Sequence, residues 1–240
     1  MDLFPSEVLL DIFDSYVNTG TEDVDAWHTL IHVCQRWRTI VLSSPRRLNL
    51  QIFCTKMRPV TKMLDIWPAF PIVVWHDDPS SNVYRANDIV AALEHPDRVR
   101  EIRFETISCP TLKAVKVAME VPFPVLTTLI LKICSIDVNR PLPYLPNPLL
   151  GGSAPRLQSL DLAFIPFSRT RELLLSANDL VHLSLSFGTY QIVPPEEIAT
   201  CLSSMAKLES ISLASQPYAQ QQPQRLSPLS RVIVFPTLPL

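Results

Sequence analysis

The sequence predicts an α+β chain in which a small N-terminal block of helices is followed by an irregular array of strand–helix units. Two observations predict this fold. Roughly the first fifty residues carry amphipathic helical patterns, and from about residue 97 onward one apolar phrase recurs every 23 to 31 residues. A period of that length is typical of solenoids, whose short strands stack into one parallel sheet.

The first predicted helix begins near Pro5, where a proline is tolerated because its missing N–H would have no partner in a first helical turn. Glu7 follows at the positive end of the helix dipole. Apolar residues then recur at helical spacing and form one broad stripe that consists of Val8, Leu9, Ile12, Phe13 and Tyr16. This stripe predicts an amphipathic helix.

A second amphipathic helix is predicted after a loop at Asn18–Thr21. Its apolar residues are Val33, Cys34, Trp37, Ile40 and Val41. The two helices belong to a block of about 45 residues, near the size at which a domain is marginal without metals, disulfides or association. The block carries more apolar residues than it can bury by itself, so we expect a partner to cover part of it.

The order Leu-x-Pro-x-Glu-Val-Leu-Leu-x-Ile-Phe, followed by Val-Cys-x-x-Trp-Arg, resembles the F-box family. The resemblance extends to the F-box proteins of mushroom-forming fungi. It implies a three-helix module over residues 1–47 that binds the Skp-type adaptor of cullin-based ubiquitin ligases. By motif position, the adaptor-facing surface and its support would consist of Pro5, Val8, Leu9, Ile12, Phe13, Leu30, Val33, Cys34, Trp37 and Arg38. The motif does not divide these residues between surface and support.

Composition narrows the possible functions. The chain has 240 residues and a formal net charge of −2, so binding to nucleic acid is not predicted. There is no apolar leader or membrane-spanning run, and we expect a cytoplasmic and/or nuclear protein without membrane contact. The five cysteines are scattered along the chain, and we expect them to be reduced thiols. With only four glycines the chain contains no phosphate-binding loop motif, so no cofactor is predicted.

Catalytic and metal sites are not predicted either. His28 and His32 stand one helical turn apart, as zinc ligands do, but no third ligand is marked, and we expect both to face solvent. Cys34 and His32 are two residues apart, which in a helix places a thiol and a base on different faces. A hydrolase that uses Cys34 or His28 is the least favoured alternative.

The repeated phrase is L-x-x-L-x-L with conservative apolar substitutions, and its last two apolar positions share one face of a strand. It occurs at Val99–Phe104, Leu126–Leu131, Leu157–Leu162, Leu180–Leu185 and Leu208–Leu213. Phrase and period are those of leucine-rich repeats. Helical segments are expected between the phrases, at Asp88–His95, Thr111–Met119, Arg171–Asn178 and Pro195–Met205.

Residues 48–96 are predicted to connect and cap the array, and residues 97–240 to form the solenoid. Within the connecting region, Phe70-Val73-Trp75 is a candidate degenerate copy, with Val60–Trp67 as its helix. Leu48–Ile52 alternates like a capping strand. Because Phe235–Leu240 resembles the lead-in to a further repeat, we expect the array to be truncated at the C-terminus.

The residues between the apolar positions would face away from the core and form a concave surface. Our candidate substrate contacts there are Thr128, Ile130, Ser159, Asp161, His182 and Ser184, with Thr127, Gln158, Ser210 and Ser212 beside them. The favoured hypothesis is the substrate-recognition subunit of a Skp-cullin-F-box ubiquitin ligase, which holds an unknown protein target near the conjugating enzyme. The alternative is a non-catalytic scaffold, or a truncated product, that binds the adaptor without delivering a substrate.

Overall fold

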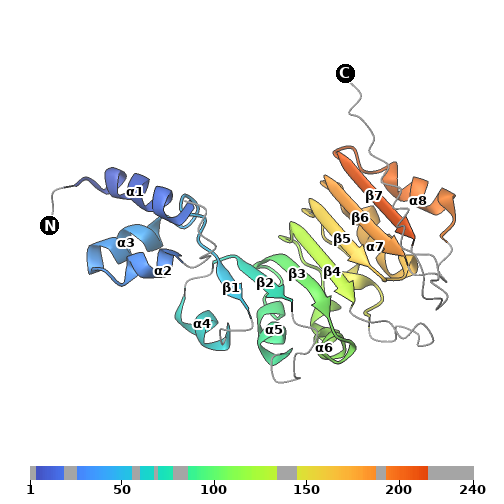
Figure 1. The fold of residues 1–240 in the computed structure, drawn as a ribbon, viewed down its shortest axis with the longest axis horizontal. Coiled ribbons are helices and arrows are strands. Elements are labelled where there is room, and N and C mark those ends of the chain that lie inside the picture. Colours follow the sequence, from blue (N-terminus) through green and yellow to red (C-terminus); the bar gives the residue numbers. More distant parts are fainter. Residues whose placement is uncertain are drawn as a thin grey trace, which may run out of the picture.

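The computed structural model describes residues 4–18, 26–55, 60–67, 70–77, 86–133, 145–187 and 193–215. These residues form eight α-helices and one seven-stranded sheet. All neighbouring strands are parallel, and their order in the sheet is their order in the chain. Figure 1 shows the strands side by side in a curved array with the N-terminal helices at the β1 end. The predicted combination of helices with a parallel sheet is therefore confirmed.

Three helices make up the N-terminal helical block: α1 (Ser6–Asn18), α2 (Ala26–Ile31) and α3 (Gln35–Ser43). Phe13 of α1 is fully buried and its ring lies 4.7 Å from that of Trp37 on α3, measured between centroids. Helix α3 begins two residues later than the apolar pattern predicts. Cys34 is extended and acts as its N-cap, since its sulfur accepts a hydrogen bond from the Trp37 N–H.

The repeated phrases supply the strands from β3 onward, and two further strands precede them. The strands are β1 (Ile52–Cys54), β2 (Ile72–His76), β3 (Val99–Ile107), β4 (Thr128–Ile133), β5 (Ser159–Ala163), β6 (His182–Phe187) and β7 (Ser210–Ser215). Equivalent apolar positions pair across the sheet, as Leu129 does with Leu160 and Leu131 with Leu162. The periodicity thus predicts both the strands and their relative register.

Helices connect the strands. They are α4 (Val60–Ile66), α5 (Ala86–Leu93), α6 (Cys109–Val115), α7 (Phe167–Ser176) and α8 (Pro195–Leu202), with short 3₁₀ helices at Val117–Met119 and Leu149–Gly152. The helical segments predicted between the phrases are present, but α7 begins at Phe167, four residues before the predicted start at Arg171. Pro195 and the acidic Glu196 open α8, as expected for a helix N-terminus.

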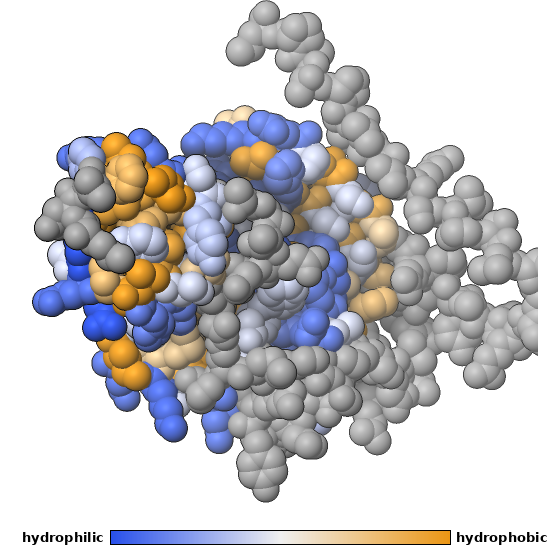
Figure 2. Space-filling view, turned by 60° about the vertical axis from the view of Figure 1, so that its left-hand side comes forward, coloured by the Kyte–Doolittle hydropathy of each residue, from blue (hydrophilic) through white to orange (hydrophobic). Residues whose placement is uncertain are grey.

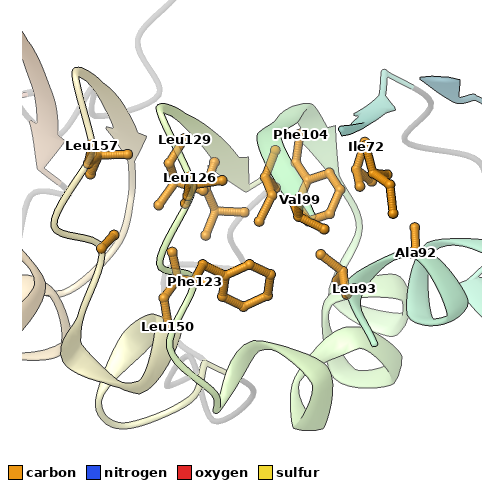
Figure 3. Close-up of a cluster of buried hydrophobic side chains, with 14 of the residues drawn as sticks. Ile72, Ala92, Leu93, Val99, Phe104, Phe123, Leu126, Leu129, Leu150 and Leu157 are labelled. Carbon is orange, nitrogen blue, oxygen red and sulfur yellow. The ribbon is translucent and has the colours of Figure 1, made fainter. Parts of the chain in front are cut away.

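The hydrophobic core fills the space between the sheet and the connecting segments (Figure 3). Phe104 and Leu129 point into it from the strands, while Leu93 and Phe123 meet them from the opposite side. All four side chains are fully buried. Gly151 makes the turn beside this core with φ of +57°, and a Cβ there would lie 2.7 Å from the Pro122 nitrogen. Gly151 therefore allows the chain to pack against Pro122 more closely than any other residue would.

Strand β2 differs from its predicted register by one residue. Val74 and His76, rather than Val73 and Trp75, pair with the core positions Ile102 and Phe104 of β3. Because side chains alternate along a strand, this shift turns Trp75 outward and leaves it 41% exposed. His76 takes an apolar position in the core, where its ring centroid lies 6.3 Å from that of Phe104.

The capping strand is also shorter and later than predicted. Of the predicted Leu48–Ile52 stretch only Ile52 lies in β1, since Asn49 adopts a positive φ of 47° and the chain turns there. Both β1 and β2 pair into the same sheet as β3, so the sheet runs across the boundary predicted between residues 96 and 97.

The lead-in at Phe235–Leu240 lies outside the described residues. None of the helices that the structure describes is long and apolar enough to cross a membrane.

Candidate functional site

The outer side of helix α1 carries an apolar ridge. Phe4, Val8, Ile12 and Tyr16 stand four residues apart, a spacing that aligns side chains along one side of a helical segment. Their exposed fractions are 56%, 39%, 50% and 44%, and that of Val33, which precedes α3, is 56%. We call these five residues the apolar ridge. Leu9 and Phe13, by contrast, are turned into the core of the helical block.

The structure divides the candidate adaptor contacts between surface and support. Leu9, Phe13 and Leu30 are buried, and Trp37 is half-buried. The exposed candidates are Pro5, Val8, Ile12, Val33, Cys34 and Arg38. Two ridge residues, Phe4 and Tyr16, are missing from the candidate adaptor contacts, although Tyr16 belongs to the predicted apolar stripe and Phe4 stands four residues before Val8.

Arginines hold the ends of the helical block in place. Arg36 donates from Nη2 to the Phe4 carbonyl at 2.6 Å, which ties the start of the chain to α3. Arg38 donates from Nε to the Ile31 carbonyl at 3.1 Å, and so satisfies a carbonyl at the C-terminus of α2. These bonds fix the backbone that carries the ridge. Arg38 is thus a supporting residue as well as an exposed one.

Figure 2 brings the N-terminal end of the molecule forward and shows hydrophobic residues gathered there among hydrophilic ones. Single exposed apolar residues are common on protein surfaces, but contiguous ones with a polar rim mark interaction sites. Polar neighbours on α1 include Glu7 and Asp11, both exposed, and Asp11 forms an ion pair with Arg47. The apolar ridge has the character of a protein-docking surface.

The second candidate surface is the side of the sheet that faces away from the core, here called the sheet face. The register aligns the candidate substrate contacts in two rows across the strands. One row holds Thr128, Ser159 and His182, and the other holds Ile130, Asp161 and Ser184. All six therefore lie on one face, as predicted, and Trp75 extends the second row through Arg103.

Charged residues form a network across the sheet face. Lys132 Nζ lies 2.9 Å from Asp161 Oδ2 and 3.0 Å from Glu105 Oε2, so it links β3, β4 and β5. The hydrogen bond that Lys132 donates to Asp161 raises the pKa of Lys132 above its ordinary value of 10.5, and the one donated to Glu105 adds a smaller contribution. The carboxylate of Asp161 is therefore already paired with the ammonium group of Lys132. Further along the face, His182 Nδ1 lies 2.8 Å from the Ser210 hydroxyl oxygen.

Two predicted members of the sheet face lie elsewhere. Thr127 and Gln158 precede β4 and β5, and they line a groove at the edge of the sheet where the strands begin. The same groove is lined by Arg98, Arg100 and Arg156, which no sequence motif indicated. Its residues come from segments far apart in the chain, and only the parallel sheet brings them together.

His28 and Cys34, the residues that a hydrolase would use, take part in ring packing and helix capping. His28 packs against Trp27 and Trp67, with ring centroids 3.9 Å and 5.1 Å away, so the prediction that it faces solvent is wrong, whereas His32 is exposed. Cys34 caps α3. Burial, followed by the charge of Asp88, raises the pKa of Cys54 to about 12. Within the described ranges, no three His, Cys, Asp or Glu side chains are grouped so as to hold a metal ion.

Comparisons with known proteins give no family assignment: no protein-family model matches the chain, and no curated protein is significantly similar to it.

Proposed function

We propose that this chain is an F-box protein with leucine-rich repeats that acts as a substrate-recognition subunit of a ubiquitin ligase. In this proposal the helical block docks on a Skp-type adaptor and, through it, on a cullin. The observation that carries the proposal is the apolar ridge, whose Val8, Ile12 and Tyr16 form an exposed face of α1 in addition to the face that builds the core. It occurs within the residues whose order resembles the F-box motif.

The ridge suits a partner that binds helices through apolar contacts. Phe4, Ile12 and Val33 each leave half or more of their surface in water, and burying that surface against a partner is favourable in proportion to its area. Aromatic residues such as Phe4 and Tyr16 are frequent anchors of protein interfaces. An acidic residue introduced into such a contact would be buried without a partner, which makes the ridge testable.

The array supports the second half of the proposal. Its phrases have the period of leucine-rich repeats, its strands follow chain order in one parallel sheet, and its helices connect them. The sheet face, with Thr128, Ile130, Ser159, Asp161, His182 and Ser184, is the proposed surface for a protein target. The chain would contribute no catalytic group. It would raise the concentration of the target near the conjugating enzyme, in the cytoplasm and/or nucleus.

The experiment uses the full chain, because Trp27 of the helical block packs against Trp67 and Phe70 beyond it and a short N-terminal fragment would lose those contacts. The chain is mixed with a purified Skp-type adaptor and a cullin and separated by size-exclusion chromatography. We expect one complex that contains all three proteins. Separate elution of a chain that circular dichroism shows to be folded would contradict the proposal.

A further inference from the structure

The groove at the starting edge of the sheet has the size of a ligand site. Its volume is about 520 Å³, within the range of clefts that hold small molecules or short peptide segments. Arg98 and Arg100 reach it from the start of β3, and Arg156 from the segment before β5. Thr127 and Gln158 lie between them. Three arginines thus line one groove, and Arg100 also donates from Nη1 to Asn49 Oδ1 at 3.3 Å.

The charge of the groove is positive. Asp97 and Asp179 also line it, but Asp179 forms an ion pair with Lys207 at 2.6 Å. Asp97 makes no such ion pair with another described residue, so it is the acid that faces Arg100 and Arg156 in the groove. Arg98 is already engaged, because its Nε donates to the Phe70 carbonyl at 3.2 Å. Arg156 is exposed and makes no hydrogen bond to the part of the chain that the structure describes.

Backbone hydrogen bonds join the segments that line the groove. The N–H of Thr127 donates to the Arg100 carbonyl, and the N–H groups of Gln158 and Val181 donate to the carbonyls of Thr127 and Gln158, each at 2.8 Å. Main-chain donors at this edge are thereby used. A ligand would be bound chiefly by the arginine side chains, each of which offers several N–H donors in a planar fork.

We propose that this arginine groove binds an extended anionic segment of a protein, through phosphate or clustered carboxylate oxygens that bridge Arg100 and Arg156. Guanidinium groups recognise such oxygens by paired, charge-assisted hydrogen bonds. Phosphate is the better fit, because it carries more charge and three acceptor oxygens. A short groove that also contains Asp97 is a poor site for nucleic acid, which is bound by long basic surfaces.

The groove and the ridge are separate surfaces. That the occupant belongs to a recruited ligase target rests on the proposed function, whereas binding of an anionic peptide does not. The variant Ile12→Asp/Val33→Asp, which removes the ridge, should therefore bind the peptide as the original chain does. Failure of the groove proposal and failure of adaptor docking can be told apart in this way.

The test is fluorescence anisotropy with the full chain and a labelled Gly/Ser peptide that carries two phosphoserines. Matched peptides carry two glutamates or no acid. We expect binding in the order phosphoserine, glutamate, unmodified, and we expect Arg100→Gln/Arg156→Gln to weaken phosphopeptide binding by about tenfold or more. The control is Arg169→Gln/Arg171→Gln on α7, a helix that follows the opposite end of β5, and it should bind normally.

Three results would overturn the groove proposal. They are the absence of binding by any charged peptide, equal phosphopeptide affinity in the Arg100/Arg156 variant and the original chain, and tighter binding of an oligouridylate of equal charge. Binding of the phosphopeptide alone would identify phosphate as the anion, and binding of both charged peptides would identify negative charge in either form. The affinity should also fall as salt is added, because exposed charges are screened.

Discussion

Neighbouring residues of α1 have opposite environments. Ile12 is 50% exposed and Phe13 is fully buried, because successive residues of an α-helix are rotated by about 100° around its axis. Consecutive apolar residues of α1 therefore lie on two different faces of the helix, one turned to the core and one turned to solvent. Leu9 and Phe13 stabilise the helical block, while Val8 and Ile12 remain available to a partner.

This division predicts different costs for truncating adjacent side chains. Phe13→Ala should lower the free energy of unfolding by about 3–5 kcal/mol, because it leaves a cavity beside Trp37. Ile12→Ala should change it by less than about 0.5 kcal/mol, since its side chain lies at the surface. Urea unfolding of both variants measures the difference. Equal losses would show that Ile12 belongs to the core.

At the scale of strands and helices, the residue pattern predicts most of the array. Strands β3 to β7 follow the L-x-x-L-x-L phrases. In these phrases apolar and polar residues alternate, so only one register places the apolar side chains in the core. Strand β2 has three successive apolar residues, Ile72–Val74, which fit either face. Its register was decided by pairing with β3, so no local pattern could have placed Trp75 on the sheet face.

The candidate sites were only partly predictable for the same reason. The apolar patterns predicted two helices of the block and the resemblance implied a third, but the division between ridge and core depends on how α1, α2 and α3 pack together. No sequence motif marks the arginine groove, because Arg98 and Arg100 belong to the unit of β3 and Arg156 lies before β5, more than fifty residues later in the chain. Proximity across strands is a property of the sheet and is not visible in any short segment.

The link that Lys132 makes between three strands gives a pH-dependent prediction. Its raised pKa means that the folded state favours the charged lysine, so the contribution to stability is complete below pH 10.5 and is lost as pH rises through the higher folded pKa. Lys132→Met should cost no more than about 1 kcal/mol near neutral pH, because the pairs are partly exposed.

Urea unfolding at about pH 8 and at about pH 11.5 tests this behaviour. The difference in unfolding free energy between the original chain and Lys132→Met should shrink at the higher pH. A difference that stays constant would show that the ammonium charge of Lys132 does not stabilise the sheet.

At the scale of the whole molecule, one aromatic cluster joins the helical block to the array. The ring of Trp27 on α2 lies 5.3 Å from that of Trp67 and 5.7 Å from that of Phe70, measured between centroids. Trp27 is almost completely buried, and one continuous hydrophobic core includes both parts of the molecule. The cluster therefore fixes the ridge relative to the sheet face, as the proposed recruitment of a target by proximity would require.

Replacing Trp27 should uncouple the two parts. We expect a single heat-absorption peak for the original chain in differential scanning calorimetry and two peaks for Trp27→Ala, since the cooperative unit would be divided. Trp75→Ala is the matched control, because Trp75 lies on the exposed sheet face. A single peak for Trp27→Ala, merely shifted to lower temperature, would mean that other contacts hold the parts together.

The central claim, that the apolar ridge docks on a Skp-type adaptor, is tested most directly by isothermal titration of the adaptor into the full chain. The control Ile66→Asp/Val117→Asp makes the same substitutions at residues that are 70% and 74% exposed outside the ridge. We predict one-to-one binding by the original chain and the control. Ile12→Asp/Val33→Asp should bind about a hundredfold more weakly or not at all. Equal affinity of the two double variants, or no binding by the original chain, would contradict the claim.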